Sequence, residues 1–291
     1  MITQRFYLNE YFPELGENGC NAYVDCYIPS RPENAGETLK NKKYPCMVIC
    51  PGGGYGKVSH REAEPIAFKF LELGFSVFVI YYSIAPHHFP QQLLEVAGVM
   101  ELIHQNAEEW EVDSSSISIM GFSAGGHLAM LYASRYTEQS AIPIKFQISW
   151  VGPSNFNLLF ATPDIKRPIE GPHAEQENKF IKEMSNFMYA LSGEEISLEE
   201  LTKDRVIAIK SKVSPVDVAH ATTPPAVLAY GGKDRLVNAE HGTQMANKLK
   251  ELGIDQHLII FPESGHELGR DPKCTDSLQR AILDYCEKYF D

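Results

Sequence analysis

The sequence predicts an α/β fold, in which helices cover both faces of a mostly parallel central sheet. Short apolar runs alternate along the chain with segments of helical periodicity, as in proteins built from strand–helix–strand units. The run from 75 to 82 is apolar apart from one serine, which is typical of a strand buried on both faces. A chain of 291 residues is long enough to bury a substantial core without disulfides or metals.

The elements can be assigned in order from these patterns. Residues 22–28 alternate with period two and predict antiparallel strands at an edge of the sheet. Gly74 stands where it would end a helix marked by apolar residues 66–71. The remaining expected strands are 46–50, 75–82, 117–120, 146–151, 226–230 and 257–261, and the remaining expected helices lie around 93–103, 125–135, 239–252 and 278–286.

A long segment interrupts this alternation. About 70 residues separate the expected strands 146–151 and 226–230, which is more than a plain crossover needs. No composition shift suggests a linker. The sequence therefore predicts a single domain over 1–291 with an inserted cap over about 154–212.

The charge balance excludes some classes of partner. The 26 lysines and arginines are outnumbered by 38 aspartates and glutamates, which gives a formal net charge of −12. Nucleic acids and anionic membrane surfaces require basic patches, so neither is an expected partner. We expect a small-molecule ligand, and the sequence leaves the oligomeric state open.

The cysteines and the N-terminus bear on location. The six cysteines form no C-x-x-C pair and no disulfide framework, a pattern that suits a reducing compartment. The first residues lack an apolar stretch of secretory length, and no run is long enough to cross a bilayer. These observations predict a cytoplasmic protein.

The strongest chemical signal is Gly121-x-Ser123-x-Gly125, which lies between an expected strand and an expected helix. A sharp strand-to-helix turn exposes the serine hydroxyl and needs small neighbours on both sides. The free N–H groups at the helix N-terminus favour developing negative charge there. The alternative is a glycine-rich turn with a solvated serine.

A serine nucleophile needs a base that a third group orients. Asp234 follows the expected strand 226–230, and His266 follows the expected strand 257–261. The chain order serine, acid, histidine and the position after parallel strands both fit a triad. Asp217 and Glu263 are weaker candidates for the acid, and a turn aspartate or a surface histidine is the structural alternative.

The glycines that follow the strand 46–50 complete the expected site. Acyl transfer needs N–H donors aimed at an oxyanion, and a loop without side chains can present backbone amides. We assign the donors to Gly53, Gly54 and Ala124, the residue after the nucleophile. A phosphate-binding loop is the alternative, but 52–57 lacks both the Gly-Lys-Ser/Thr ending and the G-x-G-x-x-G layout.

The other histidines are weaker candidates. His127 lies one helical turn after Ser123 and is expected to pack beneath the turn. His60, His87 and His88 are expected on surface loops. No set of His, Cys, Asp or Glu has the spacing of metal ligands, so the sequence predicts neither a metal nor a cofactor.

The motifs at 51–55, 121–127, 232–234 and 265–266 together resemble the α/β-hydrolase superfamily. Within it the chain is similar to bacterial acetyl-xylan and feruloyl esterase-like proteins, which are neighbours of the hormone-sensitive-lipase group. The segments 60–65 and 82–86 strengthen that likeness. One departure is Pro51, which stands where the hormone-sensitive-lipase pattern has histidine, and it favours the carbohydrate-esterase side.

The resemblance implies a serine esterase that hydrolyses short-chain acyl esters, such as acetyl groups on sugars or xylo-oligosaccharides. It covers roughly 45–153 and 213–290 and does not extend to the expected cap. Another serine acyl hydrolase, such as an arylformamidase or a small peptidase, remains an alternative, as does a non-catalytic binding module on the same fold.

Overall fold

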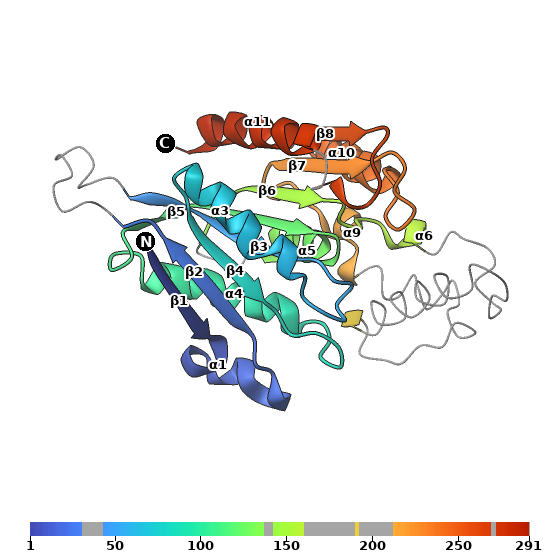
Figure 1. The fold of residues 1–291 in the computed structure, drawn as a ribbon. Helices are drawn as coiled ribbons and strands as arrows, with labels where there is room; N and C mark the ends of the chain where they lie inside the picture. Colours follow the sequence, from blue (N-terminus) through green and yellow to red (C-terminus); the bar gives the residue numbers. More distant parts are fainter. Residues whose placement is uncertain (31–42, 137–141, 160–189, 192–211, 269–271, 291) are drawn as a thin grey trace.

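The computed structural model describes residues 1–30, 43–136, 142–159, 190–191, 212–268 and 272–290. Within them the chain forms an eight-stranded sheet with the order β1-β2-β4-β3-β5-β6-β7-β8 (Figure 1). β1 and β2 are antiparallel to their neighbours, and all other pairs are parallel. The strands are β1 (Ile2–Tyr7), β2 (Tyr23–Ile28), β3 (Tyr44–Cys50), β4 (Ser76–Tyr81), β5 (Val112–Phe122), β6 (Ile144–Trp150), β7 (Ala226–Gly231) and β8 (Gln256–Phe261).

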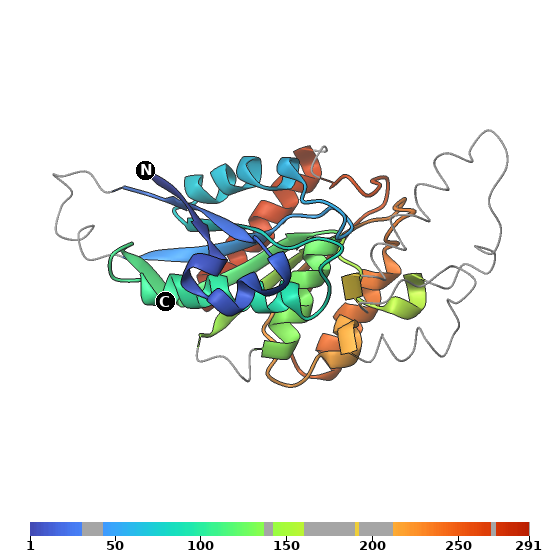
Figure 2. The ribbon, with the colours of Figure 1, turned by 90° about the horizontal axis from the view of Figure 1, so that it is seen from below.

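Helices cover both faces of the sheet, as expected. Figure 2 shows α3 and α11 on one side and α4, α5 and α10 on the other. The longer helices are α3 (Glu64–Glu72), α4 (Gln91–Gln105), α5 (Ala124–Tyr136), α10 (Glu240–Glu251) and α11 (Pro272–Tyr289). The shorter ones are α1 (Leu8–Tyr11), η1 (Pro13–Gly19), η2 (His60–Glu62), α6 (Phe156–Leu159) and α9 (Pro215–Val218).

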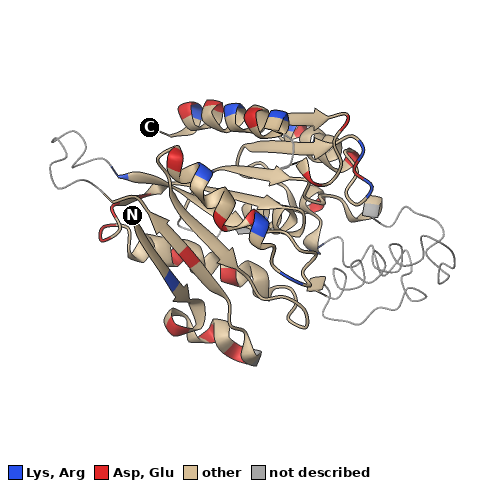
Figure 3. Cartoon of the chain, viewed as in Figure 1, with Lys and Arg blue, Asp and Glu red and all other residues tan. Residues whose placement is uncertain are grey.

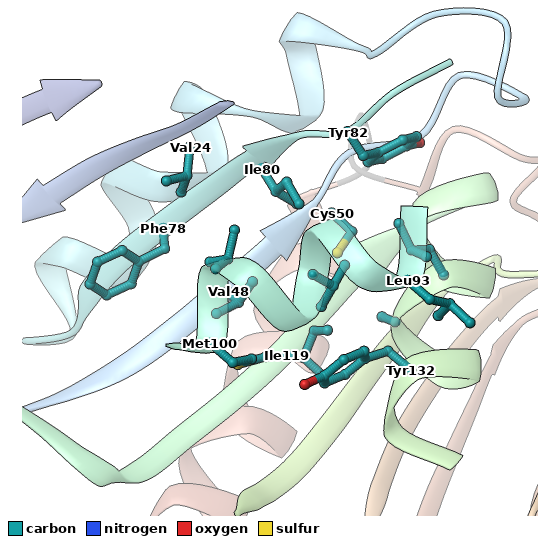
Figure 4. Close-up of a cluster of buried hydrophobic side chains, with 14 of the residues drawn as sticks. Val24, Val48, Cys50, Phe78, Ile80, Tyr82, Leu93, Met100, Ile119 and Tyr132 are labelled. Carbon is teal, nitrogen blue, oxygen red and sulfur yellow. The ribbon is translucent and has the colours of Figure 1, made fainter. Parts of the chain in front are cut away.

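The pleat of the strands divides the core into two layers. Val48 and Cys50 of β3 face the α4 and α5 side, where they join a cluster with Leu93, Met100 and Tyr132 (Figure 4). Met47 and Ile49 point the other way and pack with residues of α3 and α11. Both sets are fully buried, so the strand reads as a continuous apolar run rather than an alternating one.

The outer surface of α11 is charged. Figure 3 shows acidic and basic residues alternating along the exposed side of α11. Its opposite side buries Leu278, Ala281, Ile282 and Tyr285 against the sheet. This is the amphipathic pattern of a helix that lies between core and solvent.

The N-terminal strands correct one expectation. Antiparallel strands do form there, but only β1 is an edge strand, because β2 pairs with both β1 and β4. Val24 and Cys26 of β2 are buried, whereas β1 is largely exposed and holds Asp25 through two hydrogen bonds from Arg5. The burial of β2 is what an interior strand requires.

The parallel strands bring their carboxyl ends to one edge of the sheet, on the right in Figure 1. The loops after β3, β5, β6, β7 and β8 therefore meet there. Most of the expected cap over 154–212 lies outside the described residues, so it stays a prediction. Among the helices that the structure describes, none has the length and apolar character needed to cross a membrane.

Candidate active site

Ser123 occupies a strained turn between β5 and α5. Its φ of +50° lies in the left-handed region, which few non-glycine residues adopt. A Cβ on Gly121 would lie 2.0 Å from the carbonyl oxygen of Gly125, and one on Gly125 would lie 1.9 Å from that of Cys50. Neither position can carry a side chain without backbone movement. The turn therefore depends on both glycines, as the sequence predicts.

His266 lies within hydrogen-bond reach of both other expected triad members. Its Nε2 is 2.9 Å from Ser123 Oγ, and its Nδ1 is 2.7 Å from Asp234 Oδ2. A carboxylate only accepts, so Nδ1 donates to Asp234 and Nε2 is left to accept the serine proton. The structure thus joins three side chains from the loops after β5, β7 and β8.

Asp234 is held by its own loop. Its side chain is fully buried, and Oδ1 accepts the N–H groups of Leu236 and Val237 at 2.8 and 3.0 Å. These two bonds leave Oδ2 aimed at the imidazole. The weaker candidates lie elsewhere: Glu263 is exposed and pairs with Lys233, and Asp217 is exposed on α9.

The glycine loop after β3 lies directly beside the nucleophile. A Cβ on Gly52 would be 3.1 Å from the Cβ of Ser123. Gly53 and Gly54 have φ values of +133° and +63°, which favour glycine. The carbonyl of Gly52 accepts from Ser59, and that of Gly53 accepts from Gly56 and Lys57.

The amides of this loop differ from its carbonyls. Within the described part of the chain, no group accepts the N–H of Gly53 or of Gly54. Ala124 is the first residue of α5, so its N–H has no partner inside the helix. These are the three residues that the sequence assigns as donors.

His127 packs beneath the turn, as expected, and makes two contacts that the sequence analysis did not anticipate. Nε2 donates to the carbonyl of Val213 at 2.7 Å, and Nδ1 accepts from the hydroxyl of Tyr55 at 2.8 Å. Burial lowers the pKa of His127 to about 4, so the ring is neutral at pH 7. It acts as a buried connection between the glycine loop and α5.

Of the other three candidate histidines, His60 begins η2, and His87 and His88 lie in the loop between β4 and α4. His60 and His88 are exposed, while His87 is half-buried against the Cys20 thiol. In the ranges that the structure describes, no group of three or more His, Cys, Asp or Glu side chains is arranged to hold a metal ion.

Glu62 contacts the glycine loop, and the sequence assigned it no role there. Its Oε2 accepts the N–H of Gly52 at 2.9 Å. Only its place in the segment 60–65 pointed toward it, and that resemblance assigned it no role.

Comparisons with known proteins agree with this architecture. The model of the BD-FAE family matches residues 36–249. An endo-1,4-beta-xylanase B from Butyrivibrio fibrisolvens is 27% identical over 78% of this chain and 33% of its own length. An acetylxylan esterase from Xylanibacter ruminicola is 24% identical over 92% of this chain and 46% of its own length. The chain thus spans a third to about half of these curated relatives.

A solved structure has the same fold over its whole length. The acetyl ester-xyloside bifunctional hydrolase from Caldicellulosiruptor lactoaceticus superposes with a TM-score of 0.73 at 21% identity, covering 98% of this chain and 96% of that one. The family match extends over more than half of the residues, and the solved structure shares the overall fold. The chain therefore belongs to the BD-FAE family and has the α/β-hydrolase fold.

Proposed function

We propose that the protein is a carboxylic ester hydrolase in which Ser123, His266 and Asp234 form a catalytic triad. One observation carries the proposal: a continuous hydrogen-bonded row runs from Ser123 Oγ through the imidazole of His266 to the buried carboxylate of Asp234. A hydroxyl, a neutral base and an orienting acid in this order are what serine acyl transfer requires.

In the proposed reaction, His266 acts first as a base and then as an acid in each half-reaction. His266 Nε2 takes the proton of Ser123 as Oγ attacks the ester carbonyl, and then delivers it to the leaving alcohol. The acyl group remains on Ser123 until a water attacks it while giving a proton to the same imidazole, which then returns that proton to Ser123 Oγ as the acid is released. Asp234 holds Nδ1 protonated and stabilises the imidazolium that forms in both steps.

The tetrahedral oxyanion would be bound by the amides of Gly53, Gly54 and Ala124. Their lack of acceptors in the described residues supports this assignment, as does the close approach of Gly52 to Ser123. Removing one such donor costs on the order of 10²–10³ in rate in serine hydrolases.

For the substrate we propose short-chain acyl esters, with acetyl groups on sugars or xylo-oligosaccharides as the natural class. The names of the relatives support it, since an acetylxylan esterase, a xylanase and an acetyl ester-xyloside hydrolase are among them. An arylformamidase or peptidase with the same triad is the alternative, and parallel assays on ester, formamide and peptide substrates separate these. The proposed chemistry needs no cofactor and no macromolecular partner.

A cytoplasmic location belongs to the same proposal. All six cysteines lie in the described part of the chain, and none of them forms a disulfide. Five of these free thiols are buried. Unpaired cysteines in this number are typical of proteins in a reducing compartment.

The test is Ser123→Ala assayed on p-nitrophenyl acetate, with Ser115→Ala as the matched control. Ser115 lies near the amino end of the same strand, exposed, and bonds only locally to Asp113. We expect S123A to abolish turnover and fluorophosphonate labelling, while S115A keeps both. Retained turnover in S123A would remove Ser123 from the mechanism.

An acyl-length series that includes acetylated xylo-oligosaccharides tests the substrate. The proposal expects the highest kcat/KM for acetyl esters. A preference for long acyl chains would overturn the carbohydrate-ester assignment while leaving the triad in place.

A further inference from the structure

The glycine loop after β3 has a backbone that needs external support. Gly53, Gly54 and Tyr55 all have positive φ values, of +133°, +63° and +57°. A tyrosine in the left-handed region is unfavourable unless its surroundings impose that conformation. The groups that impose it therefore decide where the loop amides point.

Two of these supports are buried tyrosine hydroxyls. Tyr82 donates to the carbonyl of Pro51 at 2.7 Å, and Tyr55 donates to His127 at 2.8 Å. They fix the two ends of the loop. Neither of these two hydrogen bonds involves the amide of Gly52, Gly53 or Gly54.

The third support is the carboxylate of Glu62, which reaches the loop from η2. Its Oε2 accepts the N–H of Gly52 at 2.9 Å. The adjacent Arg61 forms its ion pair with Glu267, at 3.3 Å, and not with Glu62. Glu62 thus engages the amide of Gly52, while the amides of Gly53 and Gly54 are left without acceptors in the described chain.

The carboxylate of Glu62 lies close to the nucleophile. A Cβ on Gly52 would lie 2.8 Å from Glu62 Oε2 and 3.1 Å from Ser123 Cβ, so one glycine separates the carboxylate from the nucleophile. Negative charge that close opposes the formation of an oxyanion. The hydrogen bond from Gly52 to Glu62 can offset this cost, because it orients the glycine loop.

We propose that Glu62 is a positioning residue, which holds the amide of Gly52 and thereby directs the amides of Gly53 and Gly54 toward the reacting carbonyl. The inference rests on the proposed esterase function. What matters in it is the accepted hydrogen bond and not the charge. Glutamine can accept the same bond through its amide oxygen, whereas alanine cannot.

The experiment compares Glu62→Ala, Glu62→Gln and Glu62→Asp on p-nitrophenyl acetate. E62A should lower kcat by about 10- to 100-fold, since misplacement by about 1 Å costs that much, with KM changed by less than about twofold. E62Q should stay within about threefold of wild type, and E62D, whose carboxylate is retracted by one methylene, should fall between them. Glu64→Ala is the matched control, because Glu64 is exposed two residues away at the start of α3.

The outcomes separate this role from the parent proposal. Wild-type kcat in E62A, or an equal loss in E62Q and E62A, would overturn the positioning role while esterase activity stands. Should E62A fail to fold, E62D decides: full kcat there also counts against the role. A wild-type protein that hydrolyses no ester would overturn the proposed function itself.

Discussion

The hydroxyl of Tyr55 donates to Nδ1 of His127 at 2.8 Å, across 72 residues of sequence. The bond joins the loop after β3 to the first turns of α5, on either side of Ser123. Both side chains are buried, so little solvent competes for the contact. The proposed oxyanion donors and the proposed nucleophile are thereby held in one connected unit.

Tyr55→Phe tests that connection. Removing the hydroxyl takes away the donor to a buried ring nitrogen, which should lower the free energy of unfolding by about 1–3 kcal/mol. We expect kcat on p-nitrophenyl acetate to fall as well, because Tyr55 lies at the end of the glycine loop. Urea unfolding and steady-state kinetics measure the two effects. Tyr11→Phe, at a residue that is 45% exposed, should change neither.

Asp234→Asn tests the proposed role of the acid. An asparagine amide no longer selects the imidazole tautomer that leaves Nε2 free to accept a proton. We expect kcat to fall by about 10²–10⁴-fold with a melting temperature close to that of the wild type. The exposed Asp276 on α11 provides a control as Asp276→Asn. If D234N kept wild-type kcat, Asp234 would not be the orienting acid.

Gly125→Ala tests the geometry of the turn. Its Cβ would lie 1.9 Å from the carbonyl oxygen of Cys50, so β3 and α5 would have to separate. Gly126→Ala is the graded comparison, because its closest contacts are 3.0 Å. Thermal unfolding and turnover should show a much larger loss for G125A than for G126A. Equal losses would mean that the close approach of β3 to α5 does not limit the turn.

Acid should destabilise the fold through two buried histidines. Burial lowers the pKa of His127 and of His241 to about 4, whereas histidine in an unfolded chain titrates near 6.5. Between these values the unfolded state binds protons that the folded state does not. The free energy of unfolding should therefore fall as the pH falls from about 6.5 to about 4, by up to about 3 kcal/mol per histidine.

Urea unfolding at about pH 7.5 and pH 5 measures this dependence. His127→Gln should show a shallower pH dependence than the wild type, because one of the two groups is gone. His104→Gln, at an exposed position on α4, should keep the wild-type slope. An unchanged slope in H127Q would show that His127 does not titrate in this window.

Much of the sheet could be predicted because parallel strands buried on both faces appear in the sequence as continuous apolar runs. The strand expected at 46–50 extends two residues further, as Tyr44–Cys50, and that at 226–230 one further, as Ala226–Gly231. β5 is longer than the expected 117–120 because it begins at Val112, beyond a polar serine run. That run carries no apolar signal, so the pattern could not show it.

The candidate site was predictable for a topological reason. Parallel strands place their following loops at one edge, so the order of Ser123, Asp234 and His266 is enough to expect a meeting point. The supports of that site were not predictable. Tyr55 bonds to His127, 72 residues away, and Glu62 bonds to the backbone of Gly52, 10 residues away; no local sequence pattern encodes either contact. The φ of +50° at Val151 was not predictable either, because β-branched residues rarely adopt the left-handed region.

The two amides that grip Asp234 limit how this site could be rebuilt. Leu236 and Val237 belong to the same short loop as Asp234, so the carboxylate and the two N–H donors that orient it lie in one continuous segment. An aspartate placed instead at the end of β6 would lack these two N–H donors, and its carboxylate could rotate away from the imidazole. Relocation of the acid in this scaffold therefore calls for grafting the segment 234–237 as a whole.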